Sequence, residues 1–303
     1  MRHNYSYQSA LAASERVGWK VDDIIGGDKK LDFTKPFLPE SLARVRTVNF
    51  LSDDEKRTLN QIRGFGYLIM FGLVEEFILP FVLDHARPQL SGNDYRVRAL
   101  LQFASEEAKH IHLFKRFRQE FEQGFGHTCE VIGPPQAVAE KVLSHHPLAV
   151  ALVTLHIEWF TQRHYLDSVK DDQDLDSQFK SLLKHHWLEE AQHTKLDTLV
   201  IEAMSAEMAT EEIKKAVDEY IDIGGFLDAG MQQQAKLDIE SFERATGRRF
   251  GAVEREQLLK EQLQALRWTF IGSGMTHPNF LATVEEIKPE ARKQIEEMAP
   301  AFC

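Results

Sequence analysis

The arrangement of apolar and polar residues predicts a chain built almost entirely from α-helices. No segment shows the sustained alternation of apolar and polar residues that marks a half-buried β-strand, and no repeat of solenoid length is present. The four longest predicted helices in the first two thirds of the chain cover residues 52–86, 94–123, 147–169 and 175–208.

Local signals support these boundaries. Ser52 and Glu55 form a capping box in Ser-Asp-Asp-Glu, which begins a helix because each side chain can bond to the other's free backbone amide. Gly124 and Gly126 end the second helix, and Pro147 suits the first turn of the third. The connections are short, then long, then short. This order is typical of a four-helix bundle with one crossover.

We therefore expect an all-α, ferritin-like four-helix bundle that forms a single domain overall. An irregular N-terminal arm is expected over residues 1–50, the bundle over 51–208, and a helical C-terminal extension packed on the bundle over 209–303. Further helices are predicted within this extension, over residues 210–245, 253–271 and 289–298.

Composition and charge exclude several classes of protein. The 303-residue chain carries a net charge of −11, which argues against nucleic-acid binding because phosphates are bound by clustered Lys and Arg. Two cysteines are too few for a disulfide framework, and no secretory signal is visible, so a cytoplasmic location is expected. The apolar stretch 65–83 contains Glu75 and Glu76, which favours a buried helix over a membrane span.

Two helices carry the same pair of potential metal ligands. Glu107-x-x-His110 lies on the second helix and Glu190-x-x-His193 on the fourth, and residues three apart share one helix face. One such pair is weak evidence, since a solvated helix face is its usual explanation. Two pairs become informative if carboxylates from the first and third helices meet them.

The first and third helices do offer such carboxylates, within apolar sequence. They are Glu75 or Glu76 on the first helix and Glu158 on the third. At 1.5 Å per residue, Glu76 lies about 15 Å from the end of its helix and Glu107 about 20 Å from the start of the next, so antiparallel helices bring them level. Glu158 and Glu190 match in the same way. Buried carboxylates of this kind need cations, and the set is that of ferritin-like dinuclear sites.

The choice between Glu75 and Glu76 stays open, with Glu76 preferred. His186 lies four residues before Glu190 and seven before His193, so a third histidine can reach the same metal or act as a hydrogen-bond partner behind the ligands. His186-x-x-x-Glu190-x-x-His193 together with Glu107-x-x-His110 resembles the p-aminobenzoate N-oxygenase (AurF-type) family of di-iron oxygenases. The resemblance covers residues 75–193 and implies as ligands Glu76, Glu107, His110, Glu158, His186, Glu190 and His193.

The expected function is that of a non-haem di-iron oxygenase. Two iron ions, or manganese or a mixed Mn/Fe pair, would activate O2 as co-substrate to oxidise a small organic substrate, and the resemblance implies N-oxygenation of an arylamine. No flavin or nicotinamide motif is visible, so a separate electron donor is expected, and a homodimer is compatible with the sequence. The alternatives are a ferroxidase or iron-binding protein, another di-iron or di-manganese oxidase or hydroxylase, and a non-enzymatic helical protein.

Overall fold

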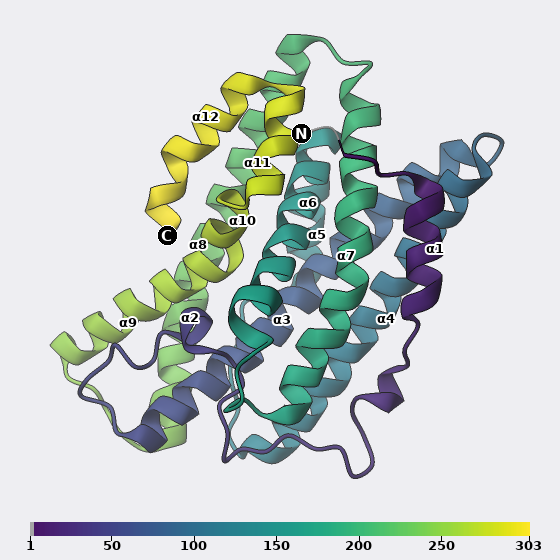
Figure 1. The fold of residues 1–303 in the computed structure, drawn as a ribbon. Coiled ribbons are helices and arrows are strands. Elements are labelled where there is room, and N and C mark those ends of the chain that lie inside the picture. The colour runs from purple at the N-terminus through teal and green to yellow at the C-terminus, as the bar shows by residue number, and fades with distance from the viewer. Residues whose placement is uncertain (1–2) are drawn as a thin grey trace.

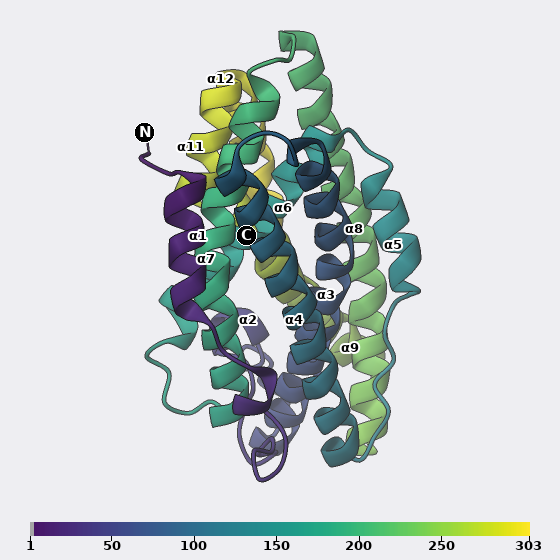
Figure 2. The same cartoon turned by 90° about the vertical axis from the view of Figure 1, so that its right-hand side faces the viewer.

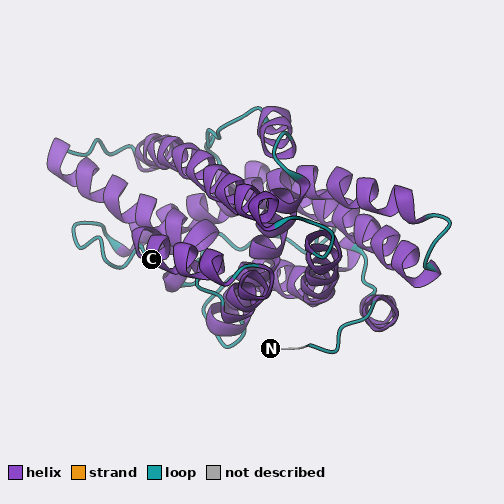
Figure 3. Ribbon diagram, turned by 90° about the horizontal axis from the view of Figure 1, so that it is seen from above, coloured by secondary structure: helices purple, strands orange, loops and turns teal. Residues whose placement is uncertain are grey.

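Four long helices form the core of the molecule. The computed structural model describes residues 3–303, and within them every regular element is helical (Figure 3). Helix α3 (Asp53–Ala86) packs along α4 (Asp94–Phe125), α6 (Pro147–Arg163) packs along α7 (Ser177–Ser205), and α4 also contacts α7. The predicted all-α fold and four-helix bundle are confirmed.

The predicted helix boundaries hold where capping chemistry is strong. The Ser52 side chain accepts a hydrogen bond from the Glu55 amide, and Glu55 bonds back to the Ser52 amide, so α3 begins at Asp53. Helix α4 ends at Gly126, whose φ of 79° lies in the left-handed region that glycine adopts without strain. The third predicted helix changes at His164 from α to π geometry, which continues to Val169.

A fifth long helix, α8 (Thr210–Thr246), closes the side of the bundle away from α1. It packs against both α3 and α6, and α9 (Ala252–Arg267) packs against it in turn (Figures 1 and 2). The chain then passes through a π-helical turn (Trp268–Gly272) and three short helices: α10 (Ser273–Met275), α11 (Pro278–Ile287) and α12 (Pro289–Met298).

Several helices lie in segments for which the sequence predicted none, among them α10 and α11 of the extension. Helix α1 (Tyr7–Val17) belongs to the N-terminal arm and lies against α4 and α7, so the described part of the arm is not wholly irregular. Ser6 caps it by accepting a hydrogen bond from the Ser9 amide. Helix α5 (Pro135–Leu143) lies within the crossover and packs on α3. The short helix α2 (Glu40–Ala43) also lies in the arm.

Helix α3 passes through the centre of the protein. By length and composition alone, Asp53–Gln89 is apolar enough to cross a membrane, since its most apolar 18-residue stretch has a mean hydropathy of 1.8. In the structure, 72% of its most apolar stretch is buried among the other helices, which favours the interpretation as a core helix.

Candidate metal centre

Two groups of potential metal ligands lie side by side in the middle of the bundle. The first consists of Glu75 from α3, His110 from α4, and His186 and Glu190 from α7. The second consists of Glu107 from α4, Glu158 from α6, and Glu190 and His193 from α7. Within each group, one donor atom from every residue lies within 4.8 Å of the others, and all seven residues are buried. Glu190 belongs to both groups, so the two positions adjoin.

The structure brings together six of the seven predicted ligands and replaces the seventh. Glu75, with 2% of its surface exposed, lies in the cluster, whereas Glu76 is half-buried and faces an outer cavity between α3 and α4. Consecutive residues of an α-helix point about 100° apart, so only one of the two can face the bundle interior. The preference for Glu76 is therefore corrected to Glu75, the alternative that the sequence left open.

The histidine rings present specific nitrogens to the carboxylates. His110 Nδ1 lies 3.1 Å from Glu190 Oε1, and His193 Nδ1 lies 2.8 Å from Glu190 Oε2 and 2.9 Å from Glu107 Oε1. His186 uses its other nitrogen, with Nε2 at 2.5 Å from Glu190 Oε1 and 3.2 Å from Glu75 Oε1. Each imidazole thus points one nitrogen at the shared carboxylate.

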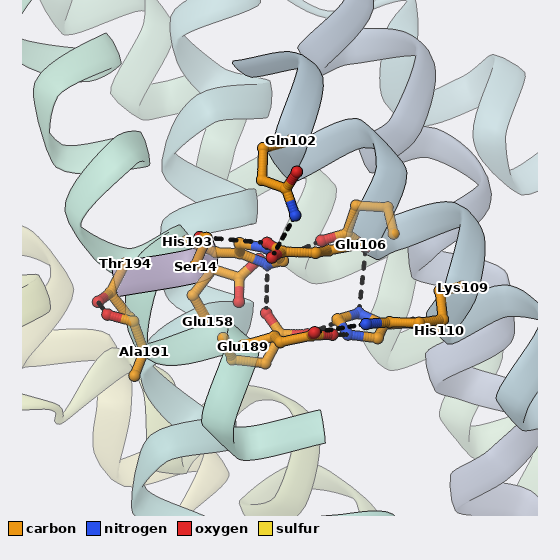
Figure 4. Close-up of polar contacts among 12 residues, drawn as sticks. Ser14, Gln102, Glu106, Lys109, His110, Glu158, Glu189, Ala191, His193 and Thr194 are labelled. Atoms are coloured by element: carbon orange, nitrogen blue, oxygen red, sulfur yellow. Dashed lines mark hydrogen bonds and ion pairs between the residues drawn. The ribbon is translucent and has the colours of Figure 1, made fainter. Parts of the chain in front are cut away.

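The imidazoles of His110 and His193 each contact a second carboxylate through Nε2, the ring nitrogen that points away from Glu190. His110 Nε2 lies 2.8 Å from Glu189 Oε2, and His193 Nε2 lies 2.9 Å from Glu106 Oε2 (Figure 4). The contacts cross between helices, since His110 and Glu106 lie on α4 while His193 and Glu189 lie on α7. When a carboxylate accepts a hydrogen bond from one ring N–H, the other ring nitrogen is left free to bind a metal.

Glu106 and Glu189, the carboxylates that contact these Nε2 atoms, are themselves held by neighbouring side chains. Gln102 donates to Glu106 at 3.0 Å, and Lys109 forms an ion pair with Glu189. Sequence reasoning missed Glu106 and Glu189, although a signal existed: each Glu-x-x-His pair is preceded by a second glutamate. It also missed Asp197, a buried carboxyl one helical turn beyond His193 whose Oδ2 has no hydrogen-bond partner.

The cluster shifts the pKa values of its members in opposite directions. Burial and the neighbouring Glu190 raise the pKa of Glu158 well above its usual value. Burial alone would raise the pKa of Glu190 as well, but His186 and His193 outweigh it and lower that pKa well below normal. For His193, burial is opposed by Glu190 and by hydrogen bonds to Glu106 and Glu107, which raise its pKa well above normal. The carboxylates therefore require compensating positive charge.

The residues present fit a pair of divalent cations. Native proteins leave few buried polar groups without a hydrogen-bond partner, and each costs about 1–3 kcal/mol. Here three such atoms are carboxylate oxygens of the two ligand groups: Glu75 Oε2, Glu107 Oε2 and Glu158 Oε2. Carboxylate and imidazole donors suit iron and manganese.

Aromatic rings enclose the cluster. The Phe103 ring stacks on His193 with ring centroids 3.9 Å apart, and the rings of Phe71 and Phe114 lie edge-on to His186 at 5.0 and 5.1 Å. On the α6 side, Tyr67 bonds to His164 Nδ1 at 3.1 Å, and His164 Nε2 bonds to the Ser273 hydroxyl at 3.0 Å. These packed side chains limit the access of water to the ligands.

Comparisons with known proteins give a likeness of fold only. No protein-family model matches the chain, and no curated protein matches it. Among solved structures, a variant R2-like ligand-binding oxidase with an aerobically reconstituted Mn/Fe cofactor aligns with 14% identity over 88% of this chain and 93% of its own, with a TM-score of 0.49. Another variant of that oxidase, with an anaerobically reconstituted Mn/Fe cofactor, aligns with 16% identity over 88% and 93%, with a TM-score of 0.47.

Proposed function

We propose that this protein is a dinuclear iron or manganese oxygenase that uses O2 to oxidise a small organic molecule. The observation that carries the proposal is the pair of adjoining, buried ligand groups that share Glu190 and contain carboxylate oxygens without hydrogen-bond partners. Glu75, His110 and His186 would hold one ion, Glu107, Glu158 and His193 the other, and Glu190 would contact both.

Two ferrous ions, when bound at these positions, supply electrons for the reduction of O2. The protein's own residues account for the rest of the arrangement. Glu106 and Glu189 fix the orientation of His193 and His110, because a carboxylate that accepts a hydrogen bond from Nε2–H keeps the proton on that nitrogen and leaves Nδ1 unprotonated. The aromatic rings around His186 and His193 pack against these ligands and keep bulk water away from the site.

The finer proposal is N-oxygenation of an arylamine, and it is supported by the motif that contains His186. In this reaction the amine nitrogen gains one oxygen atom of O2, and the other oxygen atom leaves as water. Oxidation of an amine to a hydroxylamine by this route consumes two further electrons and two protons, which a separate donor protein supplies.

Anaerobic loading with ferrous iron tests the proposal. We expect two iron ions per chain by metal analysis, and O2 uptake that increases when an arylamine is added, with the hydroxylamine detected by mass spectrometry. A folded protein that binds neither iron nor manganese would overturn the dinuclear site. Uptake of O2 that oxidises only iron, with every organic compound left unchanged, would replace the oxygenase by a ferroxidase.

A further inference from the structure

A cavity of about 180 Å³ lies on the outer side of α3 and α4, beneath the chain segment that leads into α5. Its walls are mainly apolar and include Leu73, Ile111 and Ile132. At about 30 Å³ for each water-sized group, this volume holds roughly six non-hydrogen atoms. The cavity thus has the size and the lining of a small-molecule site.

Three charged side chains also line this cavity, and all three lack ion-pair partners. Among residues 3–303, no ion pair or side-chain hydrogen bond involves Glu76, Lys115 or Arg118. The Arg118 Nε atom is buried and has no hydrogen-bond partner. By contrast, Arg116 on the same helix pairs with Asp22 at 3.0 Å. A half-buried guanidinium without a partner costs free energy, and a ligand anion would offset that cost.

The cavity lies directly beside the metal ligands. Glu76 follows Glu75, Ile111 follows His110, and the Phe114 ring both lines the cavity and contacts the His186 ring at 5.1 Å between centroids. A larger cleft of about 500 Å³ exists between the N-terminal arm and the start of α3, but none of its lining residues adjoins a cluster residue in sequence. Of these two cavities, the smaller one therefore combines ligand-sized space with proximity to the cluster.

We propose that this cavity binds a small organic acid, with its apolar body against Leu73, Ile111 and Phe114 and its carboxylate on Arg118. The proposal is independent of the proposed oxygenase activity, because the cavity lies on the outer side of α3 and α4 and none of its lining residues belongs to the two ligand groups. A guanidinium can bind a carboxylate through two parallel hydrogen bonds, and Lys115 adds a second positive charge. Glu76 cancels one of these charges, so the cavity favours a single negative charge on the ligand.

Calorimetric titration of the full-length, metal-free chain tests the proposal with three probes of one length: hexanoate, hexanamide and hexylamine. We expect one hexanoate per chain and at least tenfold weaker binding of the neutral and cationic probes. Arg118→Gln should weaken hexanoate binding at least tenfold and leave hexanamide unchanged. Arg98→Gln is the matched control, since Arg98 is an exposed residue of α4 outside the cavity, and it should change neither.

Glu76→Gln separates an acid site from an amine site. Removal of this carboxylate should tighten hexanoate binding at least twofold. The proposal is overturned if hexanoate does not saturate, if Arg118→Gln binds it as well as the unmodified chain, or if hexylamine binds best and Glu76→Gln weakens it. These titrations contain no metal, so their failure is distinct from a failure to bind two iron ions.

Discussion

Glu75 and Glu76 provide a sharp test of the metal centre, because they are neighbours with the same chemistry and different surroundings. Glu75→Gln removes one of four ligands from the group that contains His110 and His186, whereas Glu76→Gln removes a carboxylate that faces the outer cavity. We expect Glu75→Gln to bind one iron or manganese ion per chain and Glu76→Gln to bind two.

The magnitude follows from linkage between metal binding and folding. An ion present at one hundred times its Kd stabilises the folded state by about 2.7 kcal/mol, so two ions contribute about 5 kcal/mol. An unfolding entropy of roughly 2.1 cal/mol/K for each of 303 residues converts this into a rise of about 8 °C in Tm. Glu75→Gln should retain about 4 °C of that rise, and Glu76→Gln all of it.

Thermal denaturation followed by circular dichroism, with and without metal, measures both shifts, and metal analysis gives the stoichiometry. In the metal-free form, Glu75→Gln should unfold near the temperature of the unmodified chain, because Glu75 Oε2 has no hydrogen-bond partner to lose and the amide oxygen of glutamine can still accept the hydrogen bond from His186. The assignment of Glu75 is refuted if Glu75→Gln keeps two ions and the full shift, or if Glu76→Gln loses one.

Four further predictions concern the residues behind the histidines, a buried histidine and two helix glycines. Glu106→Gln and Glu189→Gln should each weaken metal binding about 10- to 100-fold in competitive titrations, since each removes the acceptor behind one histidine, and unchanged affinity would contradict that role. Burial lowers the pKa of His164 to about 3, so the unfolded chain takes up a proton that the folded chain excludes as pH falls below about 6.5. Urea unfolding should therefore show that the unmodified chain loses about 2–3 kcal/mol more than His164→Gln between pH 6.5 and 4.5, and equal losses would contradict this. Gly274→Ala should lower stability by about 1–3 kcal/mol in thermal denaturation, because its Cβ would lie 2.5 Å from the buried His156 ring. Gly224→Ala, which meets nothing within 4 Å, should raise stability by about 0.5–1 kcal/mol.

The cluster and the cavity beside it place unlike groups on different faces of the same helices. Helix α3 presents Glu75 to the bundle interior and Glu76 to the cavity, and α4 does the same with His110 and Ile111. Because neighbouring residues of a helix diverge by about 100°, two adjacent positions can serve the metal and an organic ligand separately. This arrangement is the physical basis for testing the two proposals independently.

The sequence by itself determined the helical class, the order of the bundle helices and six of the seven residues of the buried carboxylate and histidine cluster. Capping residues such as Ser52 and Glu55 act within one turn, so they predict where α3 begins without knowledge of the fold. The Glu-x-x-His pairs are equally local, since residues three apart always share a helix face.

Tertiary structure decided what depends on the rotation and neighbours of each helix. Apolar residues flank Glu75 and Glu76 on both sides, so the sequence does not indicate which of the two lies on the interior face of the helix. Only packing against α4 and α7 shows which carboxylate faces the cluster. The contacts from Glu106 to His193 and from Glu189 to His110 join residues 87 and 79 positions apart. No local pattern encodes such distant pairs, because they exist only once two helices have packed at one particular height and rotation.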